Sequence, residues 1–198
     1  MVPGWTRQRE AVRLAQAAFA APADGVVVEV GSFLGCSTIL LAGARKLRGG
    51  RKVHAIDSFD ASGDAFSRPV YETLRTEATL SLRQRFETNL HRAGVRDWVE
   101  IHQARAEDEV KSWTAPIDLL YYDGDHSYDA VTRLYDSWSG LLKDGAILAI
   151  HNSQAGYRNE SHDGSSRLVE ERIHPPEYDD IERVDTLTFA RKRGNGSR

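Results

Sequence analysis

The stretch IDLLYYDGDHSYDAV, residues 117–131, decides the fold of this chain of 198 residues. Its first half is an apolar run typical of a buried strand, and its last residues begin a helix with one apolar face. Asp123, Asp125 and His126 stand between the two elements. A strand that passes almost directly into a helix is the repeating unit of a parallel α/β sheet, so the same unit is expected elsewhere in the chain.

The alternation of strand and helix continues on both sides of this stretch. Short apolar or alternating runs predict strands at residues 25–30, 52–57, 98–104, 117–123 and 145–152. Helical spacing predicts helices at residues 6–21, 37–47, 80–94, 107–113 and 127–142. The helix at 6–21 precedes the first strand, so we expect it to cover one flank of the sheet.

The end of the chain follows a different pattern. Residues 178–184 and 186–192 are two strand-like runs with almost nothing between them, which predicts an antiparallel hairpin at the sheet edge. We therefore expect an α/β protein with a Rossmann-like, doubly wound, mostly parallel seven-stranded sheet that ends in this hairpin. One domain is expected over residues 1–192, including the N-terminal helix, followed by a flexible basic tail at 193–198.

Composition and charge narrow the class of protein. The hydrophobic fraction of 40% and the charged fraction of 28% are ordinary for a soluble domain. A net charge of -3 argues against a nucleic-acid partner. A single cysteine, Cys36, excludes an internal disulfide and a cysteine-based zinc site. No apolar run reaches the ~20 residues of a membrane span, and the first residues lack the apolar core of a signal peptide. We expect a cytoplasmic protein without a membrane partner.

The strand ends carry the polar residues of interest. In an open parallel sheet, ligands bind beyond the carboxyl ends of the strands. The first strand runs into EVGSFLGCST, residues 29–38, where two glycines permit a tight turn and close approach of a ligand, or serve the turn alone. Phe33 and Cys36 stand where a dinucleotide-binding fingerprint has glycine. Asp57 ends the second strand and can bind ribose hydroxyls, and Phe59 can lie against a purine.

These patterns together resemble the class I S-adenosylmethionine-dependent methyltransferases. The resemblance rests on E-x-G-x-x-x-G after the first strand, an acid ending the second, DGDHSY followed by LLKDGAILAIHN, and the closing hairpin. It is closest to the small bacterial O-methyltransferases of the macrocin O-methyltransferase and cephalosporin-hydroxylase type. Catechol O-methyltransferase is a more distant likeness. The resemblance covers roughly residues 5 to 192 and implies S-adenosyl-L-methionine as cofactor.

The resemblance also implies positions for the cofactor. Its methionine part would lie in the loop after the first strand, its ribose against Asp57, and its adenine against Ala104 and Arg105. Asp123 would stand beside the sulfonium and the reacting oxygen. The complete predicted cofactor set is Glu29, Gly31, Ser32, Phe33, Gly35, Ser37, Thr38, Asp57, Ser58, Phe59, Ala104, Arg105 and Asp123.

Methyl transfer to a hydroxyl requires removal of a proton, by a general base or with the help of a metal ion. The predicted catalytic residues are Asp123 and His126, since His126 stands at the offset where catechol O-methyltransferase has its lysine base; the alternative is that His126 caps a helix. By the same resemblance, the predicted metal ligands are Asp123, His151 and Asn152, for a divalent cation such as Mg²⁺ or Mn²⁺. Only Asp123 supplies a negative charge to this set, so a hard ion such as Mg²⁺ would be held less firmly than by two carboxylates, and metal dependence stays open. The alternative for His151 is a hydrogen-bonded residue that orients its loop.

The predicted function is therefore methyl transfer from S-adenosyl-L-methionine to a hydroxyl of a small metabolite, by a possible homodimer. Substrate contacts are expected from the stretch around Trp5 and Arg7, from the long lid-like connection at 58–79, and from residues 153–166. Two alternatives remain: an S-adenosylmethionine-binding domain without catalysis, and an NAD-dependent oxidoreductase. The oxidoreductase alternative is disfavoured for two reasons. The sequence lacks the G-x-G-x-x-G fingerprint, and it has no Tyr-x-x-x-Lys pair in a predicted helix.

Overall fold

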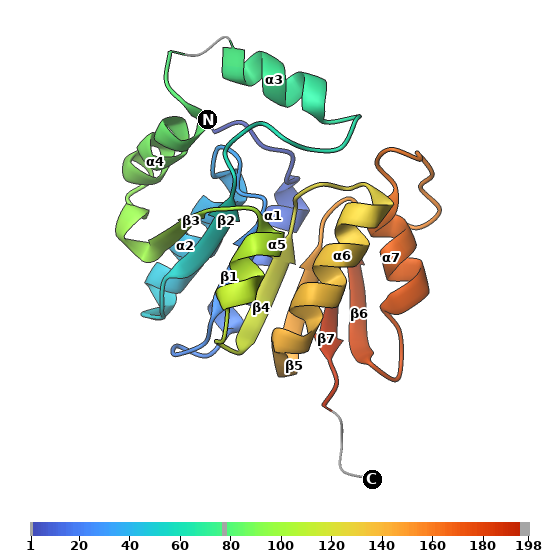
Figure 1. The fold of residues 1–198 in the computed structure, drawn as a ribbon. Coiled ribbons are helices and arrows are strands. Elements are labelled where there is room, and N and C mark those ends of the chain that lie inside the picture. Colours follow the sequence, from blue (N-terminus) through green and yellow to red (C-terminus); the bar gives the residue numbers. More distant parts are fainter. Residues whose placement is uncertain (1, 77–78, 195–198) are drawn as a thin grey trace.

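The computed structural model describes residues 2–76 and 79–194. Within this part of the chain, seven strands form one sheet in the order β3-β2-β1-β4-β5-β7-β6 (Figure 1). The strands are β1 (Val27–Val30), β2 (Val53–Asp57), β3 (Val99–Gln103), β4 (Ile117–Tyr122), β5 (Leu142–Ile150), β6 (Tyr178–Val184) and β7 (Leu187–Lys192). The α-helices are α1 (Gln8–Ala20), α2 (Cys36–Arg48), α3 (Arg68–Thr76), α4 (Leu82–Arg92), α5 (Ala106–Glu109), α6 (Tyr128–Trp138) and α7 (Gly164–Arg172). Short 3-10 turns are η1 (Arg96–Trp98), η2 (Val110–Ser112) and η3 (Ser139–Leu141).

The sheet is parallel from β3 to β5 and antiparallel beyond it. β1 pairs in parallel with β2 and β4, β2 with β3, and β4 with β5. β7 runs antiparallel to both β5 and β6, which makes β6 the outer edge. The predicted fold class is confirmed, including the C-terminal hairpin. All four residues of β1 are buried, as expected for a central strand covered on both faces.

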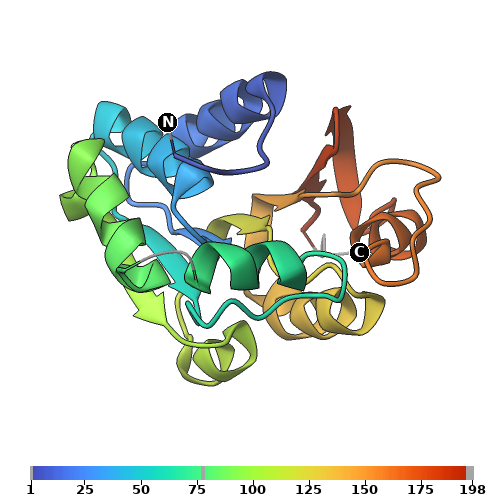
Figure 2. The same ribbon diagram turned by 90° about the horizontal axis from the view of Figure 1, so that it is seen from above.

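Helices cover both faces of the sheet (Figure 2). One hydrophobic cluster joins α1, α2 and α4 to the first face and includes Leu14, Leu41 and Phe86. The other joins α5, α6 and α7 to the opposite face and includes Val131 and Leu168. Because both faces are occupied, a ligand has access to the sheet only at the ends of the strands.

Two connecting segments contain helices that the sequence pattern did not predict. The connection at 58–79 contains α3, which buries none of its residues and lies over the carboxyl ends of the strands (Figure 1). The segment at 153–166 leads into α7, whose Leu168 and Val169 pack on the sheet. This helix opens with Gly-Ser-Ser, residues of low helix propensity, and its stability comes from burial of its apolar side.

The ends of the described chain add two findings. Arg193, the first residue of the predicted tail, donates from Nε to Asp179 at 2.9 Å, while residues 195–198 lie outside the described part. Residues 77 and 78 of the long connection also lie outside it. In the ranges that the structure describes, no helix combines the length and the apolar character needed to span a membrane.

Candidate active site

A cavity of about 330 Å³ opens at the carboxyl ends of the parallel strands. Its wall contains Gly31 beyond β1, Asp57 at the end of β2, Ala104 and Arg105 beyond β3, and Asp123 beyond β4. These positions are far apart in the sequence and meet because parallel strands present the same end to one edge of the sheet. Two further predicted cofactor residues, Phe33 and Ser58, also line the cavity.

A second cavity of about 30 Å³ lies beside the first. Its lining includes Ser32 and Ser37 from the loop after β1, and Trp5 from the N-terminal segment. Four residues belong to the walls of both cavities: Gly31, Phe33, Tyr71 and Asp123. Asp123 is therefore accessible from both spaces.

The loop after β1 requires glycine at two positions. Gly31 has φ +88°, and a side chain there would overlap with the main-chain carbonyl of Asp123. Gly35 has φ +90° and lies against the ring of Phe86, immediately before α2. Gly31 thus serves the turn and the close packing of this loop against the main chain of Asp123. Gly35 serves the turn and does not line either cavity.

Glu29 supports this loop from below. It is fully buried, and its Oε2 accepts hydrogen bonds from the hydroxyls of Ser32, at 2.9 Å, and Thr38. Burial raises the pKa of Glu29 to about 7. Its other oxygen, Oε1, has no hydrogen-bond partner among the residues that the structure describes. Glu29 and Thr38, both predicted for the cofactor, lie beneath the walls of the two cavities rather than in them.

Asp57 joins the loops beyond β1 and β2. Its Oδ2 accepts the main-chain N–H groups of Ser32 at 2.9 Å and Phe33 at 2.8 Å, and its Oδ1 accepts that of Phe59 at 2.6 Å. Burial raises the pKa of Asp57, and these donors oppose the shift. The Phe59 ring packs on Phe86, with centroids 5.1 Å apart, and lies outside the cavity walls, so the structure does not bring it to the place expected for a purine.

Asp123 is held between two histidines and a tyrosine. Its Oδ1 lies 2.7 Å from Nδ1 of His151 and 3.5 Å from Nε2 of His126, and its Oδ2 accepts the hydroxyl of Tyr121 at 3.0 Å. Burial alone would raise its pKa. The two histidines outweigh burial and hold the pKa of Asp123 well below its usual range. We call Asp123, His126 and His151 the inner cluster.

His151 has carboxylates on both sides. Its Nε2 lies 3.6 Å from the Glu10 carboxylate of α1, opposite the contact with Asp123. Burial would lower its pKa, but Asp123 and Glu10 outweigh burial and raise the pKa of His151 to about 10. Glu10 is itself held in place, because its Oε1 accepts the main-chain N–H of Thr186 at 2.7 Å. At neutral pH the buried His151 is therefore an imidazolium between two carboxylates.

Of the three predicted metal ligands, Asn152 makes its contact with another residue. It has φ +51°, and its Nδ2 lies 3.1 Å from Nε2 of His162. The donor atoms of the inner cluster do lie within 4.8 Å of one another. Both ring nitrogens of His151 already face carboxylates, however, with Nδ1 2.7 Å from Asp123 and Nε2 3.6 Å from Glu10, so neither is turned toward an ion held by Asp123. These residues do not fit a resident divalent cation.

His126 lies behind Asp123, away from the open space. Its side chain is almost fully buried, and its Nδ1 is 2.9 Å from the hydroxyl of Ser165 in α7. Burial lowers the pKa of His126 and outweighs the opposing effect of Asp123, so the imidazole is uncharged at neutral pH. His126 is not among the described residues that line the two cavities.

Residues 28–153 match the family model of a methyltransferase domain. The chain belongs to this methyltransferase family. The match begins in β1 and ends beyond β5, so it includes every strand end that contributes to the larger cavity. It favours methyl transfer over the oxidoreductase alternative.

Solved structures of other proteins, among them named methyltransferases, share the fold. Cofactor-bound Rv0187 from MTB has 21% identity and a TM-score of 0.68, with coverage of 98% of this chain and 84% of that one. The O-methyltransferase TomG from Streptomyces achromogenes, involved in tomaymycin synthesis and solved with SAM, has 20% identity, a TM-score of 0.66, and coverage of 96% and 82%. An rRNA methylase from Streptococcus thermophilus has 14% identity, a TM-score of 0.63, and coverage of 96% and 100%. At these identities the likeness shows the fold alone.

Two connecting segments of the methyltransferase meet above the inner cluster. Asp64, from the long connection, is 3% exposed, and its Oδ2 lies 3.1 Å from Nδ1 of His162 in the segment after β5. The same carboxylate accepts the hydroxyl of Ser67 at 3.0 Å and approaches the main-chain nitrogen of His126 at 3.4 Å. The structure thus joins the two segments that were expected to contact substrate, through an acid and a histidine that the sequence pattern did not single out.

An aromatic group joins the N-terminal segment to α3. The ring centroids of Trp5 and Phe33 are 5.5 Å apart, those of Trp5 and Tyr71 are 5.5 Å apart, and those of Phe33 and Tyr71 are 5.0 Å apart. Trp5 belongs to the predicted substrate segments, whereas Tyr71 was missed because it lies on a helix that the sequence pattern did not predict. All three rings line the smaller cavity beside Asp123.

Proposed function

We propose that this methyltransferase transfers a methyl group from S-adenosyl-L-methionine to a hydroxyl of a small metabolite. The observation that carries the proposal is the position of Asp123, a half-buried carboxylate that reaches both cavities at the end of a core strand. The larger cavity, of about 330 Å³, falls within the usual range for small-molecule sites. The smaller one offers space on the other side of Asp123.

The residues present fit the cofactor. Gly31, Asp57, Ala104 and Arg105 lie in the wall of one cavity, and Glu29 Oε1, beneath that wall, is a buried acceptor without a partner among the described residues. We assign the loop after β1 to the methionine part, Asp57 to the ribose, and Ala104 with Arg105 to the adenine end. When bound, the sulfonium supplies an electrophilic methyl group; the chain's own task is to position and deprotonate the acceptor.

Asp123 and His126 are proposed to receive the acceptor proton. A hydroxyl beside Asp123 donates its hydrogen bond to the carboxylate, and the proton is withdrawn to the pair that Asp123 forms with the uncharged His126. Their closest atoms are 3.5 Å apart, so the two groups titrate as a unit. His151, fixed as a cation, keeps Asp123 ionised before the acceptor binds. No metal ion enters this scheme.

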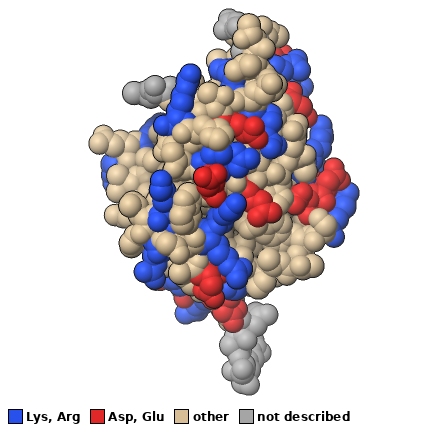
Figure 3. All heavy atoms as spheres, turned by 90° about the vertical axis from the view of Figure 1, so that its left-hand side faces the viewer, with Lys and Arg blue, Asp and Glu red and all other residues tan. Residues whose placement is uncertain are grey.

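A small acceptor is favoured over a nucleic acid by the charge of the molecule. On the face drawn in Figure 3, Lys and Arg side chains are interspersed with Asp and Glu. The net charge of the chain is -3. Binding to RNA depends on neutralising phosphates with a basic surface, so these features support a small metabolite as acceptor.

The proposal is tested by binding and turnover. Calorimetric titration is expected to show binding of S-adenosylmethionine and S-adenosylhomocysteine, and none of NAD. Incubation with S-adenosylmethionine and a panel of phenols, catechols and sugars is expected to yield S-adenosylhomocysteine, measured by mass spectrometry. Binding of NAD without either adenosyl compound would overturn the proposal. Binding without turnover on any acceptor would favour the non-catalytic alternative.

A further inference from the structure

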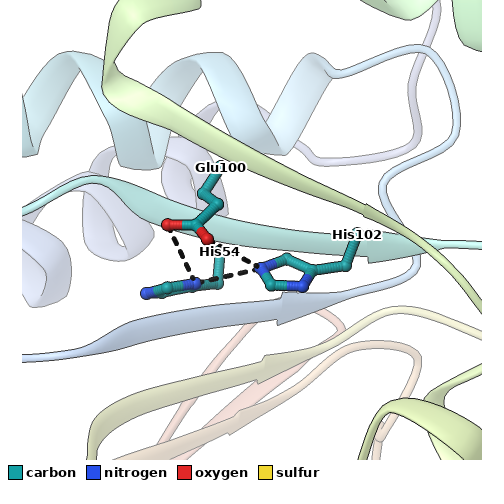
Figure 4. A group of neighbouring side chains, drawn as sticks. All are labelled: His54, Glu100 and His102. Atoms are coloured by element: carbon teal, nitrogen blue, oxygen red, sulfur yellow. Dashed lines mark hydrogen bonds and ion pairs between the residues drawn. The ribbon is translucent and has the colours of Figure 1, made fainter.

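A second group of histidine and glutamate lies on the outer strands, away from the inner cluster. His54 of β2 and Glu100 and His102 of β3 point toward one another on one face of the sheet (Figure 4). The register explains the meeting, because His54 pairs with Glu100, and the pair two residues further along, which points to the same face, joins Ile56 and His102. We call His54, Glu100 and His102 the outer cluster. None of them lines either cavity.

The distances within the outer cluster are close to those around a tetrahedral metal ion. Nδ1 of His54 and Nε2 of His102 are 3.1 Å apart. Zinc–nitrogen bonds of 2.0–2.1 Å in tetrahedral geometry place two ligand atoms about 3.3 Å apart. The Glu100 carboxylate lies 3.8 Å from the His54 nitrogen and 4.0 Å from the His102 nitrogen. Its side chain is 57% exposed, so it is free to move the short distance into a bond.

A carboxylate behind His102 sets the orientation of its ring. Nδ1 of His102 lies 2.8 Å from Oε1 of Glu109 in α5. A proton on Nδ1, donated to Glu109, leaves the lone pair of Nε2 directed at His54. This carboxylate–histidine arrangement is the usual support of a metal-binding imidazole. The carboxylates of Glu100 and Glu109 also give this group of side chains a negative electrostatic potential, which favours binding of a cation.

Trp113 restricts the two imidazoles further. Its ring centroid is 4.9 Å from that of His54, edge-on, and 5.8 Å from that of His102. The indole is itself fixed, because its Nε1 donates to the carbonyl of Ala115 at 2.7 Å. Rings held by neighbours lose little conformational freedom when they bind a ligand, which favours affinity.

We propose that His54, Glu100 and His102 bind one divalent transition-metal ion of the zinc type, with water in the remaining position. Two imidazoles and one carboxylate are a donor set that suits such an ion better than Mg²⁺ or Ca²⁺. The ion bridges β2 and β3 a few residues before Asp57 and Ala104. It therefore stiffens the two strands that carry the far wall of the larger cavity. This proposal does not rest on the proposed methyl transfer.

The test is calorimetric titration of the full chain with Zn²⁺ after removal of metals by a chelator. One Zn²⁺ per chain is expected to bind, and Asp123→Asn, which alters the inner cluster, is expected to keep that binding. His102→Gln is expected to lose it. Glu109→Gln is expected to weaken it by roughly 10–100-fold, the usual effect of removing the support of a metal-binding histidine. His91→Gln, at an exposed position on α4, is the matched control and is expected to bind as the natural chain does.

Glu100→Gln separates loss of metal binding from loss of folding, because a substitution at this largely exposed side chain is not expected to unfold the protein. It is expected to weaken Zn²⁺ binding at least tenfold while the midpoint of thermal unfolding stays unchanged. Absence of Zn²⁺ binding to the natural chain would overturn the proposal. So would Zn²⁺ affinities of Glu100→Gln and His54→Gln equal to that of His91→Gln.

Discussion

The inner and outer clusters contain the same kinds of side chain and differ in what surrounds them. In the inner cluster, His151 has a carboxylate at each nitrogen, is almost fully buried, and has its pKa raised to about 10. In the outer cluster, nitrogens of His54 and His102 face each other on partly exposed strands. The first arrangement holds a proton between carboxylates, whereas in the second, one imidazole nitrogen hydrogen-bonds the other, through a proton that a metal ion can displace. Partners and burial, rather than the count of histidines and acids, decide which chemistry a cluster supports.

The largest expected effect is that of Asp123→Asn. It removes the charge beside the proposed reacting oxygen, so we expect kcat to fall by about 10³-fold, within the range for lost acid–base groups. Binding of S-adenosylmethionine should change much less. Rates of S-adenosylhomocysteine formation and calorimetric affinities measure the two effects. Asp129→Asn, at an exposed position on α6, is the control, and equal rates for both variants would remove Asp123 from the chemistry.

His126→Gln is expected to lower kcat by roughly 10²-fold, because the proposed proton acceptor is lost. His91→Gln, at an exposed position on α4, is the control and is expected to keep the natural rate. The measurement is turnover at saturating substrate, together with the midpoint of thermal unfolding. A change in unfolding alone, without loss of turnover, would support the structural role of His126 instead.

The pH dependence of stability reports the charge on His151. Its pKa is raised from 6.5 to about 10 on folding, so its stabilisation is complete below pH 6.5 and is lost as the pH rises through 10. Glu10→Gln removes one of the two carboxylates and should make this fall between pH 6.5 and 10 smaller. Thermal unfolding followed by circular dichroism measures it.

Glu72→Gln, at an exposed position on α3, keeps both carboxylates and should retain the full fall in stability. A fall of the same size in Glu10→Gln and Glu72→Gln would mean that His151 is not protonated between Glu10 and Asp123.

The smallest expected effect separates the two clusters most directly. Addition of EDTA should leave the rate of methyl transfer unchanged, since the inner cluster does not fit a resident cation. The same treatment should remove Zn²⁺ from the outer cluster. Turnover assays with and without EDTA, followed by Mg²⁺ or Mn²⁺, measure this. If EDTA abolished methyl transfer and Mg²⁺ or Mn²⁺ restored it, the reaction would depend on a metal ion bound at Asp123.

Much of the site could be predicted from local sequence, and the remainder depends on distant contacts. Gly31, Asp57 and Asp123 each follow a predicted strand, so their meeting at one edge follows from the parallel topology. Glu10 was missed because its pattern is that of an ordinary surface helix, and its partner Thr186 lies in the last hairpin. The outer cluster was missed because alternation shows which residues share a face of one strand, but not the register between strands.

The same limit explains the position of Phe59. Sequence order places it two residues after Asp57, where a purine was expected. The backbone at Phe59 has φ +55°, and its ring turns into the core against Phe86. A local pattern does not reveal such a reversal, because it depends on the space that α4 leaves open on that side of the sheet.

The contact between Glu10 and Thr186 joins residues separated by 176 positions. On the ribosome, α1 emerges before all the strands, and β7 emerges after the other strands. His151 therefore lacks its full setting of acids until β7 has been made. The sheet from β1 to β5 can assemble during translation, but the charge arrangement around Asp123 is completed only when α1 and the β6–β7 hairpin have met.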